Sequence, residues 1–231
     1  MHITGMSNGK SPSSRGKHVR VKTARGRKRS STRWLQRQLN DPYVREAKRQ
    51  GYRSRAAFKL KEMDEKHGLI KKGDVVLDLG AAPGGWSQIA VEKGASKVVA
   101  IDLLEIEPIE GVTFLQMDFM NDDAPEALIA AIGEGADVVM SDMAHNTTGH
   151  QRTDHLRVMA LVETAYDFAL EVLNPGGTFI AKVFQGGSGS ELTNQMKLDF
   201  EKVKHIKPPS SRKNSPEEYV VALGYRGEED I

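Results

Sequence analysis

Four aspartates stand at or near the ends of successive short apolar runs of the chain: Asp78, Asp102, Asp118 and Asp142. Each run has the composition of a buried strand, and the carboxyl ends of parallel strands meet at one edge of a sheet. Asp102 follows Gly80 by 22 residues, a distance at which an acid commonly accepts hydrogen bonds from ribose hydroxyls. Carboxylates gathered at one edge suit a ligand that carries a ribose, an amine and a positive charge.

The loop after the first run reads Gly-Ala-Ala-Pro-Gly-Gly-Trp-Ser over residues 80–87 and lacks the features of two phosphate-binding loops. A P-loop needs a lysine directly before Ser87, where Trp86 stands. A dinucleotide-binding loop needs a second glycine where Ala82 stands. S-adenosylmethionine has the ribose, the amine and the positive charge but no phosphate, and we predict it as the ligand. A nicotinamide-dependent dehydrogenase is the alternative that these residues leave open.

These residues need a scaffold of alternating strands and helices, which begins near residue 73. Short apolar runs predict strands at residues 75–79, 97–101, 112–117, 138–140 and 178–183. Helical patterns lie between them at residues 86–93, 125–132 and 156–173, and Asn174-Pro175-Gly176-Gly177 is expected to end the last helix. Two further apolar runs, at 203–206 and 219–223, indicate strands without a clear crossover helix between them. The alternation predicts a doubly wound α/β fold, with a mostly parallel sheet and helices on both faces.

The first 40 residues differ sharply in charge from the rest of the chain. They contain eleven of the 33 Lys and Arg residues and no acid, which leaves 22 basic and 31 acidic residues for positions 41–231. Residues 1–31 have few large apolar side chains, so we expect a disordered basic arm that contacts RNA phosphates. A solubilising tail without a target is the alternative. We assign residues 32–226 to one folded domain and residues 227–231 to an acidic end.

Two short helices are expected between the arm and the first strand. Asp41-Pro42 is typical of an N-cap followed by proline in the first turn, and Gly51 closes this helix. Ser54 is expected to cap the second helix, which carries Lys59 and ends at His67-Gly68. Basic residues crowd this region, at Arg33, Arg37, Arg45, Lys48, Arg49, Arg53 and Arg55. We interpret them as a surface that binds RNA phosphates, with a solvated helical face as the alternative.

The composition excludes several classes of protein and site. The chain has no cysteine, which excludes disulfides, thiolate metal sites and cysteine nucleophiles. No apolar run reaches the roughly 18 residues of a membrane span, and the N-terminus lacks a hydrophobic signal segment, so a cytoplasmic protein is expected. His145, His150 and His155 are five residues apart, a spacing that does not stack side chains on a helix, and we expect no metal.

Several longer segments match one family in the family's own order. They are Ser-Arg-Ala-Ala-Phe-Lys-Leu, Asp-Leu-Gly-Ala-Ala-Pro-Gly-Gly-Trp-Ser, Asp-Leu-Leu, Asp-Phe, Met-Ser-Asp-Met-Ala, Lys-Val-Phe-Gln-Gly and Ser-Arg-Lys-Asn-Ser-Pro-Glu-Glu-Tyr. With them the chain resembles the FtsJ/RrmJ family of ribosomal RNA large subunit 2′-O-methyltransferases, the RlmE type, over about residues 33–224. His145 departs from the pattern, because the family usually has proline there. Residues 1–31 extend beyond the short basic start of many members, so no role is carried over to them.

The resemblance implies a Rossmann-like class I methyltransferase domain that uses S-adenosyl-L-methionine. It implies methylation of the 2′-oxygen of a uridine ribose in 23S rRNA, late in assembly of the 50S particle. We expect the protein to be a monomer. The resemblance also implies a catalytic tetrad of Lys59, Asp142, Lys182 and Glu217. The donor contacts that it implies are Gly80, Pro83, Gly84, Gly85, Trp86, Asp102, Asp118, Phe119 and Asp142.

Methyl transfer to a ribose requires a base, because a neutral hydroxyl is a poor nucleophile. A lysine accepts a proton only where burial or a neighbouring cation favours its neutral form. Lys182 lies in an apolar strand, and Lys59 and the donor's sulfonium are the expected positive neighbours. We therefore assign Lys182 as general base, Lys59 and Asp142 to set its charge and orient the hydroxyl, and Glu217 to position Lys59 or the ribose.

Other interpretations remain open from the residues alone. Spacing by itself is equally compatible with lysines that only extend to solvent from a sheet edge or a helix. A methyltransferase for tRNA or another RNA would share the chemistry and differ in the RNA presented. An RNA-binding assembly factor without catalysis is an alternative from a different class.

Overall fold

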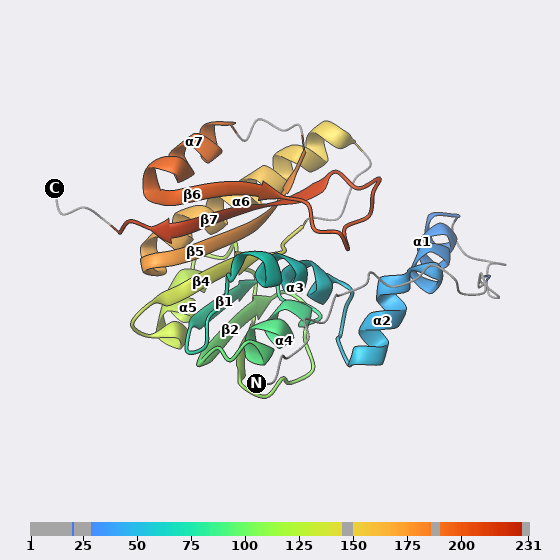
Figure 1. The fold of residues 1–231 in the computed structure, drawn as a ribbon, viewed down its shortest axis with the longest axis horizontal. Coiled ribbons are helices and arrows are strands. Elements are labelled where there is room, and N and C mark those ends of the chain that lie inside the picture. Colours follow the sequence, from blue (N-terminus) through green and yellow to red (C-terminus); the bar gives the residue numbers. More distant parts are fainter. Residues whose placement is uncertain (1–19, 21–28, 145–149, 186–189, 228–231) are drawn as a thin grey trace, which may run out of the picture.

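A computed structural model describes Arg20 and residues 29–144, 150–185 and 190–227 of the chain. Its centre is a sheet whose strands are β1 (Val75–Leu79), β2 (Lys97–Asp102), β3 (Val112–Gln116), β4 (Ala136–Ser141), β5 (Leu173–Phe184), β6 (Phe200–Ile206) and β7 (Glu217–Tyr225). The seven strands lie in the order β3-β2-β1-β4-β5-β7-β6 (Figure 1). The order reverses between β1 and β4, so the predicted doubly wound α/β sheet is confirmed.

The strands β1 to β5 pair in parallel, whereas β7 runs antiparallel to both β5 and β6. The register places Lys182 of β5 opposite Tyr219 of β7, and Phe184 opposite Glu217. Side chains alternate between the two faces along a strand, so Lys182, Tyr219 and Glu217 project from the same face of the sheet.

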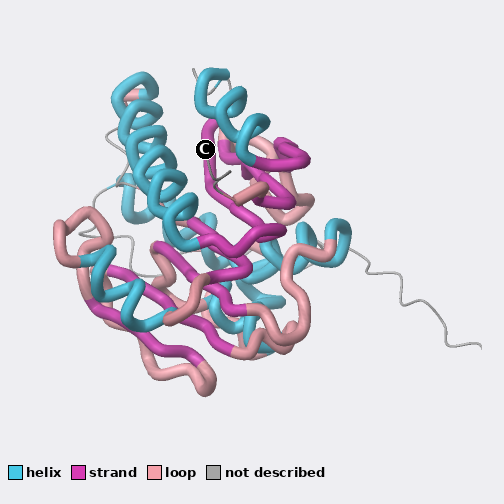
Figure 2. Tube along the Cα trace, turned by 90° about the vertical axis from the view of Figure 1, so that its left-hand side faces the viewer, coloured by secondary structure: helices cyan, strands magenta, loops and turns pink. Residues whose placement is uncertain are grey.

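Helices cover both faces of the sheet (Figures 1 and 2). One face carries α3 (Ala56–His67) and α4 (Gly85–Glu92). The other face carries α5 (Ala124–Ile132), α6 (Gln151–Val172) and α7 (Ser190–Asp199). Val76 packs toward the first set and Leu77 toward the second, which explains why β1 reads as a continuous apolar run. No helix in the described segments is long and apolar enough to cross a membrane.

Two further helices, α1 (Arg29–Asn40) and α2 (Pro42–Gln50), precede α3 and lie to one side of the sheet (Figure 1). As predicted, the side chain of Asp41 caps α2 by accepting a hydrogen bond from the Tyr43 amide at 3.0 Å. Gly51 ends α2 with φ at 79°, in the left-handed region that favours glycine. The expected boundary of the arm at residue 31 falls inside α1, and residues 1–19 and 21–28 lie outside the described residues.

Three details differ from the sequence-based expectation. The N-cap of α3 is Arg55, which makes no capping bond, although Ser54 Oγ still accepts from the Ala56 amide at 3.2 Å. The helix α7 was not predicted, because its sequence is polar over most of its length. The expected stop at 174–177 lies inside β5, which begins directly after α6. Its pairing with β4 shifts register between Ala136 and Val138, so the proline and glycines are accommodated at an irregular stretch.

The first strand buries one acid completely. Asp78 Oδ2 accepts a hydrogen bond from Ser87 Oγ at 2.6 Å, and Oδ1 has no partner among the residues that the structure describes. Burial raises the pKa of Asp78 to about 7, although the bond from Ser87 opposes the shift, and the nearby carboxylates of Asp142 and Asp102 add to it. Because the native state holds this proton more tightly than the unfolded chain, stability falls as the pH rises from about 4 toward 7.

We therefore expect Asp78→Asn to flatten the dependence of unfolding free energy on pH. Through this group the wild-type chain should lose at most about 4 kcal/mol of unfolding free energy between pH 4 and pH 8. The variant should not show this loss. Urea unfolding at several pH values measures the difference. The exposed Asp122, replaced by Asn, is the control and should leave the pH profile of the wild type unchanged. Parallel profiles for Asp78→Asn and wild type would contradict the assignment.

Candidate active site

A cavity of about 460 Å³ opens at the carboxyl ends of β1, β2, β3 and β4, where the strand order reverses. This is the position at which doubly wound sheets bind their ligands. Its polar lining includes Asp102, Asp118 and Asp142, and its apolar lining includes Leu103 and Phe119. The prediction that the aspartates at the strand ends meet at one edge is confirmed for these three, whereas Asp78 is buried beneath the cavity lining.

Backbone amides hold two of these carboxylates in place. Asp102 Oδ2 accepts from the Ala82 amide at 2.9 Å, and Oδ1 accepts from the Leu104 amide at 2.8 Å. Asp118 Oδ1 accepts from the Met120 amide at 2.9 Å. A carboxylate has about four acceptor positions, so each acid keeps capacity for hydroxyl or amine donors of a ligand.

The predicted donor contacts divide into two groups. Five of them line the cavity, namely Gly80, Asp102, Asp118, Phe119 and Asp142. The other four, Pro83, Gly84, Gly85 and Trp86, are not part of its lining.

Two residues of the second group face α3 instead of the cavity. A Cβ on Gly85 would lie 2.6 Å from Ser54 Oγ, so glycine is needed there for the loop to approach α3. Trp86 is buried, and its Nε1 donates to the Ala56 carbonyl at 2.9 Å. This end of the glycine loop therefore joins α4 to α3, and its contacts are made with protein and not with the cavity.

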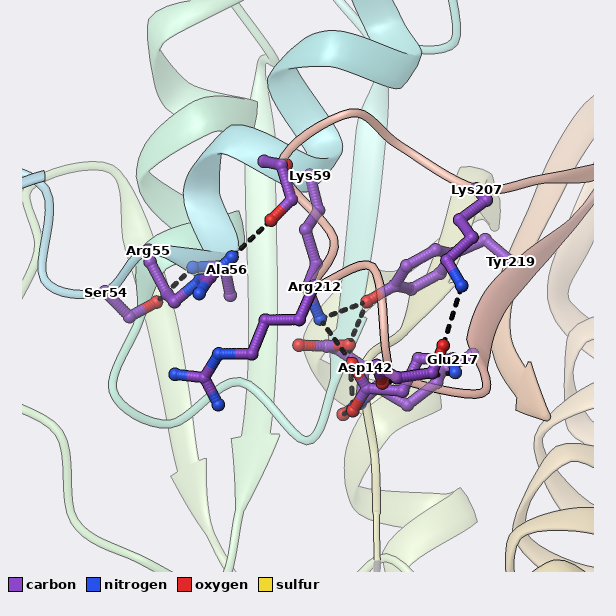
Figure 3. Close-up of polar contacts among 12 residues, drawn as sticks. Ser54, Arg55, Ala56, Lys59, Asp142, Lys207, Arg212, Glu217 and Tyr219 are labelled. Atoms are coloured by element: carbon purple, nitrogen blue, oxygen red, sulfur yellow. Dashed lines mark hydrogen bonds and ion pairs between the residues drawn. The ribbon is translucent and has the colours of Figure 1, made fainter. Parts of the chain in front are cut away.

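Three residues of the predicted tetrad, Lys59, Asp142 and Glu217, lie together in Figure 3, and the fourth, Lys182, pairs with Asp142. Lys182 Nζ lies 2.9 Å from Asp142 Oδ1 and also donates to the Asp142 carbonyl at 2.6 Å. Lys59 Nζ lies 3.3 Å from Glu217 Oε2. Because Asp142 also lines the cavity, the lysines and the ligand site share one carboxylate.

Tyr219 connects the two ion pairs, and the sequence-based assignment missed it. Its hydroxyl accepts a hydrogen bond from Lys59 Nζ at 3.0 Å and donates to Asp142 Oδ1 at 2.6 Å (Figure 3). Its ring packs against Trp86, with centroids 5.4 Å apart. The available signal was the spacing, since a residue two positions after Glu217 in a strand projects from the same face.

The charges around the cluster explain which groups are ionised. Burial of the Asp142 carboxyl favours its neutral form, but Lys182 and Lys59 outweigh it and hold the pKa of Asp142 below its usual value. The same balance, led by Lys59, lowers the pKa of Glu217. Burial and the negative charge of Asp142 raise the pKa of Tyr219 well above its usual value, so its hydroxyl keeps the proton that it donates.

The basic residues that were predicted to bind RNA fall into two groups, those that contact other parts of the protein and those with exposed side chains. Arg55 donates to Asp41 and to the Ser210 carbonyl, and Arg53 donates to the carbonyls of Glu107 and Pro108. Arg49 pairs with Glu46 on the surface of α2. Three others have exposed side chains, namely Arg37, Arg45 and Lys48, and the side chain of Arg33 lies outside the described residues. Arg49, Arg53 and Arg55 thus also have contacts within the protein, and RNA binding by this group of residues stays a prediction.

The histidines add no metal site within the described part of the chain. His150 is exposed, and His145 lies outside the described residues. Among the residues that the structure describes, no group of three or more His, Asp or Glu side chains is arranged to hold a metal ion.

Comparisons with known proteins find matches over most of the chain. Residues 52–225 match the model of the FtsJ-like methyltransferase family. A protein of Xanthobacter autotrophicus named ribosomal RNA large subunit methyltransferase E is 62% identical, over 95% of this chain and 88% of its own length. One of Sphingopyxis alaskensis with the same name is 61% identical, over 97% of this chain and 98% of its own length.

A solved structure gives the same result for the fold. A protein of Plasmodium falciparum, named as a ribosomal RNA methyltransferase, is 31% identical with a TM-score of 0.69, over 77% of this chain and all of that structure. The family match covers most of the described chain and includes the cavity, the glycine loop and the four charged residues. The chain therefore belongs to the FtsJ-like methyltransferase family.

Proposed function

We propose that this methyltransferase moves a methyl group from S-adenosylmethionine to the 2′-oxygen of a uridine ribose in 23S rRNA. The observation that carries the proposal is the double role of Asp142, which lines the cavity and pairs with Lys182. A donor in the cavity and a ribose beside Lys182 would thus meet at one carboxylate. The names of the relatives support large-subunit rRNA as the substrate. As the setting we propose the 50S particle in the cytoplasm, late in its assembly.

The cavity suits this donor in size and in chemistry. Asp102 and Asp118 can accept hydrogen bonds from ribose hydroxyls and a purine amine, and Phe119 and Leu103 offer apolar surface to the base. Asp142, together with the backbone at Gly80, lies at the end nearest Lys182 and suits the cationic part of the donor. The donor supplies an electrophilic methyl carbon on its sulfonium.

The contacts of Lys182 suit a base that removes the proton of the ribose hydroxyl. Its Nζ has two acceptors, Oδ1 and the carbonyl oxygen of Asp142. A neutral amine has two N–H groups and one lone pair, so these acceptors would orient the lone pair toward the hydroxyl. The hydroxyl proton would move to Lys182 Nζ as the oxygen attacks the methyl carbon.

The remaining residues of the cluster hold this arrangement. Tyr219 donates to the same Asp142 oxygen that pairs with Lys182, so it limits rotation of the carboxylate. Glu217 holds Lys59 at 3.3 Å and balances its charge. All four charged residues of the predicted tetrad are present and form two ion pairs, which disfavours the alternative of an RNA-binding assembly factor without catalysis. The names of the relatives favour rRNA over tRNA or another RNA.

We expect Lys182→Ala to lower kcat roughly 100- to 10,000-fold, the usual contribution of a general base. Labelled S-adenosylmethionine and 50S particles from a strain that lacks the enzyme provide the assay. Donor affinity, measured by calorimetry, should change far less than kcat, because Lys182 does not line the cavity. Undiminished methylation by the variant would refute the assignment of the base.

Replacing Tyr219 by Phe should lower kcat by about tenfold to a hundredfold, since hydrogen bonds to two charged groups are lost while the ring still packs on Trp86. The effect should not add to that of Lys59→Ala, because both changes break the same chain of contacts. Tyr166→Phe is the control: its hydroxyl bonds Asp199 on the opposite face of the sheet. Additive losses in the double variant would show that Tyr219 acts independently of Lys59.

Removal of residues 1–28 should weaken RNA binding and make it less dependent on salt, because this segment carries eight of the 33 basic residues and no acid. The cut precedes α1, so the helix itself remains. Binding to 50S particles at several salt concentrations measures the slope, and calorimetry with S-adenosylmethionine should show unchanged donor affinity. An unchanged salt slope would reduce the arm to a solubilising tail.

A further inference from the structure

Arg53 lies in the short linker between α2 and α3 but makes its polar contacts with a distant part of the chain. Its guanidinium donates through Nη1 to the Glu107 carbonyl and through Nη2 to the Pro108 carbonyl, the latter at 2.8 Å. Both carbonyls belong to the segment 103–111, which connects β2 to β3. We propose that Arg53 is a positioning residue for the methyl donor, which holds this segment as one wall of the cavity.

The segment 103–111 has no regular secondary structure, so few backbone bonds fix its shape. Its first two residues, Leu103 and Leu104, line the cavity, and they are 63% and 68% exposed. Apolar side chains so exposed at a cavity rim gain burial only when a ligand covers them. The positions of Leu103 and Leu104 depend on the contacts that later residues of the segment make. The two hydrogen bonds from Arg53 are among these contacts.

The glycine loop packs against Arg53 and the segment 103–111. A Cβ on Gly84 would lie 2.7 Å from Ile109 Cδ1 and 3.3 Å from Arg53 Cδ, so the side chains of Arg53 and Ile109 fill the space over this glycine. Gly84 also has φ at 103°, which other residues adopt only with strain. The stem of Arg53 thus lies between the glycine loop and the segment 103–111.

The linker that carries Arg53 is itself fixed to α4. The Arg53 amide donates to Gln88 Oε1 at 2.8 Å, and Gln88 Nε2 donates to the Gly51 carbonyl at 3.0 Å. The backbone of Arg53 is therefore anchored on the helix that follows the glycine loop. An anchored backbone allows a guanidinium to set the position of the carbonyls that it binds.

The alternative is that Arg53 attracts RNA phosphates, the role predicted for its neighbours on α2. Carbonyl oxygens carry no net charge, so the guanidinium keeps its positive charge in this contact. The two roles make different demands on the side chain. Phosphate attraction needs a positive charge, whereas two adjacent carbonyls need the planar fork that lysine lacks.

The proposal rests on the assignment of the cavity to the donor, and one experiment tests both separately. Arg53→Lys keeps the charge, and Arg53→Met keeps only the stem. We expect both variants to raise the Kd for S-adenosylmethionine about tenfold in calorimetry, and Arg53→Lys to keep wild-type affinity for 50S particles. Lys48→Met, on the exposed side of α2, is the matched control, with weaker particle binding and wild-type donor affinity.

Hydrogen exchange supplies a second readout. Amides in the segment 103–111 should exchange faster in Arg53→Lys than in wild type, with the rest of the sheet unchanged. This variant carries the test alone if Arg53→Met does not fold. Wild-type donor affinity and unchanged exchange in Arg53→Lys would overturn the proposal. A wild-type protein that does not bind S-adenosylmethionine would instead overturn the proposed function.

Discussion

The ion pair between Lys182 and Asp142 is the interaction on which this end of the sheet depends. The side chain of Lys182 is only 7% exposed and that of Asp142 18%, so neither charge is solvated well enough to stand alone. Removing water from a charge costs several kcal/mol unless a partner and further hydrogen bonds compensate it. Asp142 gains them from Tyr219 and Lys182, and Lys59 adds its positive charge. These contacts exist only while β5 and β7 keep their register and α3 and the end of β4 keep their places.

The glycine loop takes on a different meaning in the folded protein. In the sequence it suggests close approach of a ligand to the backbone, but Gly84 and Gly85 are needed for contacts with Arg53, Ile109 and Ser54. Trp86, the next residue, supports the ring of Tyr219. The first residues of the loop therefore line the cavity, and Trp86 near its end packs against the charged cluster. A substitution near its end acts on the cluster through packing.

Helices and strands with a regular pattern of apolar residues could be predicted from the sequence. The parallel strands and the helices between them have continuous apolar runs or one apolar side, and the cap at Asp41 has its own local signal. The helix α7 could not be found this way, because its sequence is mostly polar. The direction of β7 is set by pairing with β5, which no local pattern records.

The same distinction holds for the site. Charged residues such as Lys182 and Asp142 are conspicuous in apolar surroundings, and the family resemblance identified them. Tyr219 is an ordinary strand residue until its partners on α3 and directly after β4 are known. Arg53 was grouped with the surface arginines because the sequence does not reveal its bonds to backbone carbonyls more than 50 residues away in the chain.

The antiparallel pairing of β5 with β7 also limits how this part of the chain can evolve. Lys182 faces Tyr219, and Phe184 faces Glu217, at fixed steps along two adjacent strands. Gain or loss of a single codon at the start of β7 would turn the following side chains to the opposite face of the sheet. Glu218 or Val220 would then occupy the place of the tyrosine. One such indel would remove the tyrosine from the cluster, and only the loss of a residue would leave a carboxylate, that of Glu218, in the place of Glu217.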